Sequence, residues 1–293
     1  MKKFIIPTVV VALVAVIAVS VFKIMDINAM DKVETPTEFI DDSFTEVTLD
    51  ENLEAVSVET KEMTAFNNYL LMNSNTVGVL SIASLNEEPV VNTENQNEYL
   101  YKNIRGEKGS EGTLFSASKS DFLRSDVTTV FGHNMKNGNK FGCLKNYKSL
   151  DYVKSNPTFS AENADGKVSL KIVAVADVSS DYKANGWYYA NPNFADTKSF
   201  EKFEKEVRTR SFFVIPDRFT QNDKYVILST CDYGFEGERL IVVARIMDEN
   251  ETVDTSAYRT NNVVVRATEY YSTTGKTAPT ESAVTSNFEA NYR

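Results

Sequence analysis

The sequence predicts a mainly β domain, a closed or nearly closed β-barrel with helical insertions, behind an N-terminal transmembrane helix. Three observations support this prediction. Short runs of β-forming residues follow one another from residue 76 to about residue 247, and only two helical stretches interrupt them. One long apolar run without charges stands near the start of the chain. The composition, 42% hydrophobic over 293 residues, is ordinary for a globular protein with a core.

Charge and residue usage exclude several classes of function. The chain holds 31 Lys and Arg against 41 Asp and Glu, a net charge of -10, so we expect no nucleic-acid partner. Zinc sites rich in His or Cys need three or four such ligands. Because the chain has one His and two Cys, we expect no metal site of this kind.

Residues 1–25 are predicted to form a cytoplasmic stub and a transmembrane signal-anchor. The run 4–22 holds nineteen residues without a charge. At about 1.5 Å per helical residue the run spans roughly 28 Å, the thickness of a bilayer core. Two lysines precede it, so a single-pass protein with its N-terminus in the cytoplasm and its domain outside the cell membrane is expected. A signal peptide cleaved after residues 18–20 is the alternative, although the run exceeds the usual h-region.

Two further segments separate this anchor from the barrel domain. Twelve acidic residues and only two lysines lie between residues 26 and 62. Residues 26–43 are therefore predicted to be a solvated acidic spacer. In residues 44–75, apolar side chains recur at intervals of three and four, which predicts one or two amphipathic helices that pack on the domain.

The barrel domain is predicted over residues 76–250. Turn-forming residues separate its β-type runs. A short helix is expected near 144–153 and a second at 198–209, where three apolar residues fall on one face. The predicted strands are 77–82, 89–91, 113–115, 127–131, 168–178, 212–215, 225–229 and 240–247.

Residues 251–293 are a C-terminal extension of the barrel domain. From residue 272 onward they are rich in Ser, Thr, Ala and Asn and show no apolar periodicity. We therefore expect the end of the chain to be disordered.

Two motifs place reactive side chains at strand ends. Cys231 directly follows the strand pattern 225–230 and precedes a loop, so its thiol is held rigidly yet remains accessible. The next strand opens with Arg239, and a hairpin could return its guanidinium to the sulfur, where a cation favours thiolate and donors hold an oxyanion. His133 follows the strand 127–131 and is the only imidazole available to carry a proton near neutral pH.

The residues alone leave other interpretations open. A lone His is usually a surface or packed residue, and Cys is commonly a small buried hydrophobe. Cys143 could be the nucleophile in place of Cys231, or could form a disulfide with it outside the cell. An arginine that opens a strand after an acidic loop is most often part of a surface ion pair, so Arg239 has the weakest independent case.

Longer stretches around these residues carry a resemblance to a known family. Residues 130–138 read Val-Phe-Gly-His-Asn-Met-Lys-Asn-Gly, and 141–147 read Phe-Gly-Cys-Leu-Lys-Asn-Tyr. Residues 228–233 read Leu-Ser-Thr-Cys-Asp-Tyr, and 239–245 read Arg-Leu-Ile-Val-Val-Ala-Arg. The chain thus resembles class B sortases, membrane-anchored cysteine transpeptidases of Gram-positive bacteria, from about residue 75 to residue 247.

The resemblance implies an eight-stranded sortase-like β-barrel with N-terminal helices and one helix inserted between late strands. It implies a catalytic triad in which Cys231 attacks the carbonyl after Thr in an NPxTN-like C-terminal sorting signal of a secreted protein. His133 would protonate the departing amine and later deprotonate the incoming one, while Arg239 hydrogen-bonds the substrate or its oxyanion.

The same resemblance implies the partners of the reaction. The incoming amine would belong to a peptidoglycan cross-bridge or to lipid II, and neither a metal nor an organic cofactor is implied. Leu100, Ser229 and Thr230 are candidates for lining the substrate groove, and Asp232 is expected to shape the loop next to the thiol. A pilin-polymerising enzyme that uses a lysine acceptor is one alternative, and a non-catalytic wall-binding β-barrel with a buried Cys231 is another.

The sequence departs from the family pattern in two places. Cys143 stands where an acidic or small polar residue is expected, and a structural role is predicted for it. Residues 248–293 extend past the usual end of the domain, and the sequence indicates no function for them.

Overall fold

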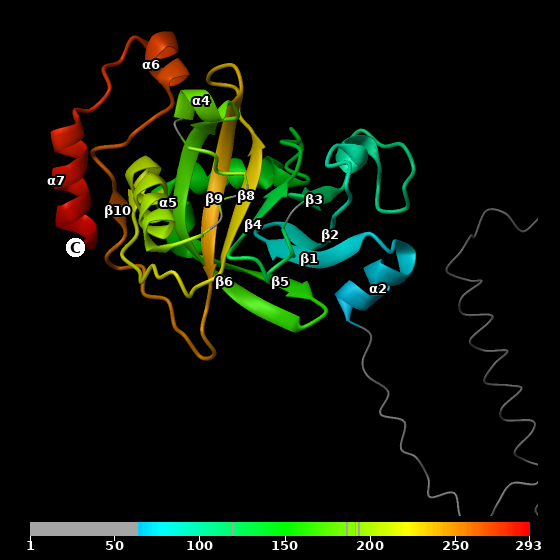
Figure 1. Cartoon of the computed structure of the whole chain (residues 1–293). Helices are drawn as coiled ribbons and strands as arrows, with labels where there is room; N and C mark the ends of the chain where they lie inside the picture. Colours follow the sequence, from blue (N-terminus) through cyan, green and yellow to red (C-terminus); the bar gives the residue numbers. More distant parts are fainter. Residues whose placement is uncertain (1–63, 119, 186, 191, 193) are drawn as a thin grey trace, which may run out of the picture. The chain divides into compact units, whose positions relative to one another are not determined.

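Eight strands close into a barrel in the order β1-β2-β3-β4-β8-β9-β6-β5 (Figure 1). The computed structural model describes residues 64–293 apart from 119, 186, 191 and 193. The pairs β2/β3 and β4/β8 are parallel and the other pairs are antiparallel, so the barrel is mixed. Its strands are β1 Thr76–Ile82, β2 Leu85–Val91, β3 Leu114–Ser116, β4 Val127–Phe131, β5 Thr158–Asn163, β6 Gly166–Ser179, β8 Tyr225–Cys231 and β9 Glu238–Ile246.

The N-terminal predictions lie largely outside the described residues. These are the transmembrane segment 1–25, the acidic spacer 26–43, and residues 44–63 of the predicted helices. The described chain begins with helix α2 (Ala65–Met72), whose N-cap Thr64 accepts a hydrogen bond from Asn67 N at 3.3 Å. Within residues 64–293, with the gaps named above, no helix combines the length and apolar character needed to cross a bilayer.

The predicted number of barrel strands is right, but one of the eight strands is a different segment from the predicted one. Residues 158–163 were not predicted as a strand and form β5, which pairs with β1 and β6. β5 reads Thr-Phe-Ser-Ala-Glu-Asn, so its inward positions carry few of the branched side chains that signal a strand. The predicted strand 212–215 instead forms β7 (Phe213–Val214), which pairs with β10 (Arg259–Thr260) in a separate small sheet.

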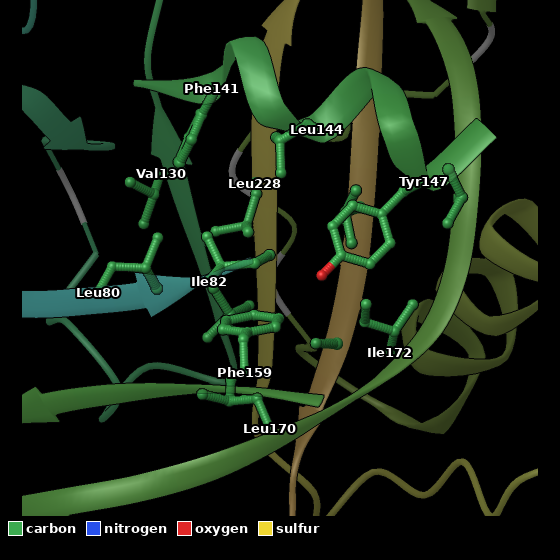
Figure 2. Packing of buried hydrophobic residues seen from close by; sticks show 14 of the residues in the cluster. Leu80, Ile82, Val130, Phe141, Leu144, Tyr147, Phe159, Leu170, Ile172 and Leu228 are labelled. Carbon is green, nitrogen blue, oxygen red and sulfur yellow. The ribbon is translucent and has the colours of Figure 1, made fainter. Parts of the chain in front are cut away.

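The barrel interior is filled by one apolar cluster. A 3-10 helix, η2 (Phe141–Lys148), runs across it and contributes side chains to the same cluster, as Figure 2 shows. Burial of these side chains provides the main driving force for closing the barrel. The labelled members of the cluster are Leu80, Ile82, Val130, Phe141, Leu144, Tyr147, Phe159, Leu170, Ile172 and Leu228.

Helix α5 (Thr197–Arg210) is the predicted helix between late strands, and it covers the outer face of the barrel. Asp196 caps it in a reciprocal capping box with Ser199. Its apolar face, Phe200, Phe203 and Val207, joins the outward-facing residues of β6 and β9 in a second cluster. The remaining helices that the structure describes are η1 (Glu98–Tyr101), α3 (Leu150–Ser155), α4 (Tyr182–Asn185), α6 (Thr268–Thr274) and α7 (Glu281–Tyr292).

The expectation of a disordered C-terminus is wrong. Residues 268–274 form α6, and residues 281–292 form α7, which packs beside α5 (Figure 1). Helix α7 is capped by Thr280 and buries only Phe288, which explains why the sequence shows no apolar periodicity there.

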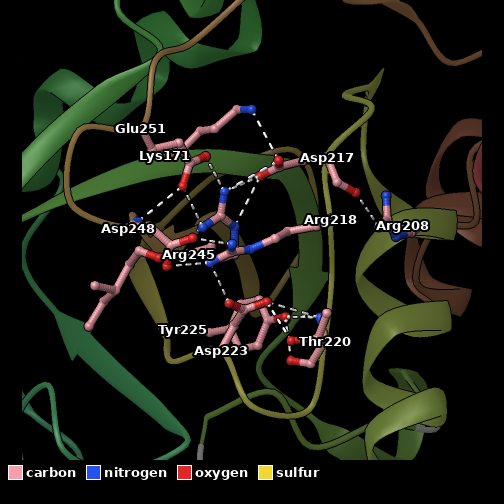
Figure 3. A network of polar contacts seen from close by, with 11 residues as sticks. Lys171, Arg208, Asp217, Arg218, Thr220, Asp223, Tyr225, Arg245, Asp248 and Glu251 are labelled. Carbon is pink, nitrogen blue, oxygen red and sulfur yellow. Dashed lines mark hydrogen bonds and ion pairs between the residues drawn. The ribbon is translucent and has the colours of Figure 1, made fainter.

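A buried ionic network fastens the start of this extension to the barrel (Figure 3). The guanidinium of Arg245 on β9 is fully buried and pairs with Asp217 at 3.1 Å and with Glu251. Lys171 on β6 also pairs with Asp217, at 3.1 Å. A buried charge is tolerated only when it is paired in this way.

Candidate active site

The parallel strands β4 and β8 end side by side and carry the two predicted motifs to one end of the barrel. Phe131 lies opposite Ser229 in the pairing of the two strands. Because β4 ends at Phe131 and β8 at Cys231, the segment that holds His133 begins next to the cysteine strand. Pairing of the strands therefore brings the histidine and cysteine motifs together.

The β8–β9 hairpin brings Arg239 to Cys231, as the sequence predicts. The two residues are direct partners in the antiparallel register, so their side chains point to the same face of the sheet. Arg239 donates from Nη1 to the carbonyl of Glu238 at 2.9 Å, which orients the guanidinium plane. Cys231 is only partly buried.

The loop after β4 is fixed to the cysteine strand by hydrogen bonds. Gly132 N donates to Ser229 O at 3.2 Å, and Thr230 Oγ1 donates to Gly132 O at 2.8 Å. Asn134 Nδ2 donates to Cys231 O at 2.8 Å. No role is predicted for Asn134 from the sequence, yet its side chain ties the two motifs together directly.

His133 is oriented from the other side of the site. Its Nε2 lies 2.7 Å from the carbonyl oxygen of Leu100, and its ring lies 5.4 Å from that of Tyr101. A carbonyl only accepts, so Nε2 carries the proton of this hydrogen bond. The hydrogen bond leaves Nδ1 as the nitrogen that can exchange a proton with a reacting group.

All six predicted site residues line one pocket of about 460 Å³. Ser229 and Thr230 are almost fully buried, so they shape the pocket floor more than they offer contact surface. The six residues are Leu100, His133, Ser229, Thr230, Cys231 and Arg239.

A second wall of the pocket was missed by the sequence analysis. It comes from the segment that follows β6 and includes Tyr182, Trp187, Tyr188 and Tyr189. Tyr189 OH lies 3.1 Å from Ser229 Oγ, and burial raises the pKa of this phenol, so it stays neutral. The run of three aromatic residues at 187–189 is a signal that could have indicated a binding surface.

Cys143 lies in a different environment from Cys231. It is 2% exposed, belongs to the barrel core and donates to Lys140 O at 3.5 Å. Burial raises the pKa of its thiol to about 11. Both cysteines are free, so the alternative of a disulfide between them is wrong in this structure. The buried, protonated thiol of Cys143 also makes it a poor nucleophile.

The pocket unites a thiol, an imidazole and a guanidinium, the groups needed for nucleophilic acyl transfer. In such chemistry a thiolate can attack a carbonyl, an imidazole can transfer protons, and a guanidinium can stabilise negative charge on oxygen. Among the residues that the structure describes, no cluster of three or more His, Cys, Asp or Glu side chains could hold a metal ion.

Comparisons with known proteins find sortase B proteins among the relatives of this chain. The chain is 28% identical to Sortase B of Listeria monocytogenes over 181 residues, which cover 60% of this chain and 71% of that protein. The solved structure of Sortase B from Listeria monocytogenes matches with a TM-score of 0.53 and 27% identity, over 61% of this chain and 98% of that one. A Staphylococcus aureus sortase B–substrate complex shares the fold, with a TM-score of 0.56 and 20% identity over 62% and 84% of the two chains. No protein-family model matches the chain.

Proposed function

Because the chain is a member of the sortase B family, we propose that its pocket is the active site of a transpeptidase that anchors secreted proteins to the cell wall. The observation that carries this proposal is the direct pairing of Cys231 with Arg239 in the pocket that His133 also lines. A wall-binding barrel with a merely buried Cys231 fits less well, since the thiol is partly exposed to this pocket.

The proposed substrate is an extended peptide with an NPxTN-like signal near the C-terminus of a secreted protein. A relative of known structure was solved with a substrate, which supports a peptide in this pocket. The aromatic side chains after β6 and the apolar Leu100 would face such a peptide. Ser229 and Thr230 would shape the floor beneath it.

The first half of the reaction forms an acyl-enzyme. The Cys231 thiolate attacks the carbonyl carbon of the Thr in the signal, and the carbonyl oxygen becomes an oxyanion that Arg239 stabilises. The C–N bond breaks as His133 gives its proton to the leaving amine. The products are a thioester on Cys231 and the released C-terminal fragment.

The second half transfers the acyl group. An incoming amine attacks the thioester, His133 accepts its proton, and the C–S bond breaks to restore the thiolate. The proposed acceptor is an amine of the peptidoglycan cross-bridge or of lipid II. The three side chains account for every proton transfer and bond change in this scheme, so it needs no metal or organic cofactor.

A peptide panel tests this proposal. The purified full-length protein is incubated with NPxTN-type peptides, with a peptide bearing an N-terminal glycine or with one whose only amine is a lysine side chain. We expect cleavage after Thr and a new amide with the glycine peptide. Transfer to the lysine side chain alone would instead indicate pilin polymerisation. Absence of cleavage after Thr in every peptide, or cleavage by Cys231→Ala, would overturn the proposal.

The proposed location is the outer face of the cell membrane. The uncharged run 4–22 after two lysines supports an anchor with a cytoplasmic N-terminus. A membrane-held enzyme would meet secreted proteins as they cross the bilayer.

A further inference from the structure

The C-terminal extension returns to the end of the barrel that holds the pocket. After β9 the chain follows β7 and α5, where β10 pairs with β7 and Val265 N donates to Thr209 O at 2.9 Å. Helix α6 then packs against α4 (Figure 1). Tyr182 of α4 lines the pocket, so the extension supports the far side of that wall.

Two side chains of the extension bind residues at the C-terminal end of β6. Arg266 Nη1 pairs with Asp177 Oδ2 at 2.7 Å, and Ser179 Oγ donates to Glu269 Oε1 at 3.0 Å. Ser179 itself lines the pocket and pairs with Glu238 on β9. Both contacts therefore act on the strand that leads into the second wall of the pocket, called here the aromatic wall (Tyr182, Trp187, Tyr188 and Tyr189).

A chain of ion pairs continues from Asp177 to the residue after Cys231. Lys148 on η2 lies 3.0 Å from Asp177 and also pairs with Asp232. Asp232 N donates to Glu238 O at 3.0 Å, which closes the β8–β9 loop beside the thiol. Asp232 thus shapes this loop, as expected from the sequence.

The charged groups at the Asp177 end of this series of ion pairs are largely removed from water. The Asp177 side chain is 8% exposed, and burial raises its pKa, so its ionised form depends on Lys148 and Arg266. The Arg266 guanidinium lies between two rings, 4.3 Å from the centroid of Phe212 and 5.0 Å from that of Tyr270. This stacking fixes the orientation of the guanidinium before it reaches Asp177.

We propose that Arg266 and Glu269 of the C-terminal extension are positioning residues for the transpeptidase site. Arg266 holds Cys231 in register through Asp177, Lys148 and Asp232. Glu269 holds Ser179 and the aromatic wall that binds the peptide. The inference rests on the proposed function of the pocket, and it assigns a role to a segment beyond the usual end of the domain.

The two residues have separable kinetic signatures. In the full-length protein, Arg266→Ala is expected to lower kcat on the order of tenfold with KM changed less than about twofold. The reason is that the series of ion pairs from Arg266 ends at Asp232, next to the nucleophile Cys231. Glu269→Ala is expected to raise KM by about fivefold with a smaller effect on kcat, and Glu269→Gln, which keeps an acceptor oxygen, to restore most of it. The proposal is overturned if both alanine variants keep wild-type kcat and KM.

A matched control separates positioning from stability. Arg293→Ala breaks the 2.8 Å pair between the same extension and Glu204 on α5, away from the pocket. We expect it to lower the unfolding temperature while kcat and KM stay within about twofold of wild type. Equal kinetic losses in Arg293→Ala and Arg266→Ala would show that the extension acts only through stability.

The route through Lys148 has its own test, a double-mutant cycle. If Arg266 acts through Lys148, then Arg266→Ala lowers kcat much less in a Lys148→Ala background than in wild type. Full additivity of the two effects contradicts this route.

Thiol alkylation keeps the inference testable even if no peptide is cleaved. In a Cys143→Ala background, Arg266→Ala is expected to slow alkylation of Cys231 by iodoacetamide about threefold or more, because the thiol shifts from the Arg239 cation. Arg293→Ala should leave this rate unchanged. A wild-type protein that cleaves no signal peptide would refute the proposed function alone, whereas equal alkylation rates in all variants would refute the positioning role.

Discussion

The strand register decides which residues lie next to Arg239. Its contribution to turnover follows from the planar arrangement of its guanidinium N–H donors. It lies opposite Cys231, and Nη1 is already held by the Glu238 carbonyl. Arg239→Lys keeps the charge but loses the planar fork of donors, so we predict a fall in turnover of about 10²-fold, and at least as much for Arg239→Ala. Steady-state cleavage of a signal peptide measures this, and near-normal turnover in both variants would return Arg239 to a surface ion-pair role.

The two cysteines are predicted to differ in reactivity. With a pKa of about 11, the Cys143 thiol is ionised to only about one part in a thousand at pH 8, and its side chain is 2% exposed. Iodoacetamide at pH 8 should therefore modify Cys231 and spare Cys143 until the protein is unfolded. Mass mapping of the labelled peptides checks this, and rapid labelling of Cys143 in the folded protein would contradict it.

The same burial predicts a pH dependence of stability. The pKa of Cys143 rises from 9.0 to about 11 on folding, so the unfolded chain releases this proton first. The stabilisation is complete below pH 9 and is lost as the pH rises toward 11, by at most about 2 to 3 kcal/mol. Between pH 8 and pH 10.5, the free energy of unfolding measured in urea should fall less for Cys143→Ala than for wild type. An identical decline in both proteins would refute this prediction.

At the scale of elements, the loop between β4 and η2 depends on close backbone approach. A Cβ at Gly142 would lie 2.1 Å from the Met135 carbonyl oxygen, which is backbone and cannot rotate away. We predict that Gly142→Ala costs about 2 kcal/mol or more of unfolding free energy and loosens the histidine loop. Gly109→Ala is the matched control, since the nearest atom there is 3.9 Å away. Equal urea midpoints for the two variants would refute the prediction.

The elements show where sequence reasoning succeeds and where it stops. β4, β8 and β9 are dense in branched residues, so their positions and the strand-end placement of His133 and Cys231 could be predicted. β5 and α7 could not, because β5 is built on small and polar residues and α7 buries a single side chain. The short predicted strand at 212–215 was assigned to the wrong sheet, since local propensity does not say which partner a strand finds.

The candidate site was predictable in part for a similar reason. Cys231 and Arg239 are joined by a hairpin that sequence spacing can describe, His133 follows a recognisable strand, and the family resemblance supported all three. The hydrogen bond of Asn134 to Cys231 and the wall around Tyr189 come from packing between distant segments. No local pattern encodes such contacts, so the structure was needed to find them.

At the scale of the whole molecule, the predicted N-terminal anchor would decide where the barrel works. We predict that the native protein keeps residues 1–22, sediments with membranes and exposes its domain outside the cell, because the apolar run spans a bilayer and follows two lysines. Membrane fractionation with protease accessibility on whole cells measures this. A released protein whose N-terminus lies just after Ser20 would contradict it.

The account as a whole depends on a thioester at Cys231. The most direct test incubates the full-length protein with an NPxTN-type peptide in the absence of an amine acceptor and measures the intact mass. We predict an adduct with the mass of the peptide up to its Thr less one water, mapped to Cys231 and discharged when an amine is added. Peptide cleavage without this adduct, or an adduct on Cys143, would contradict it.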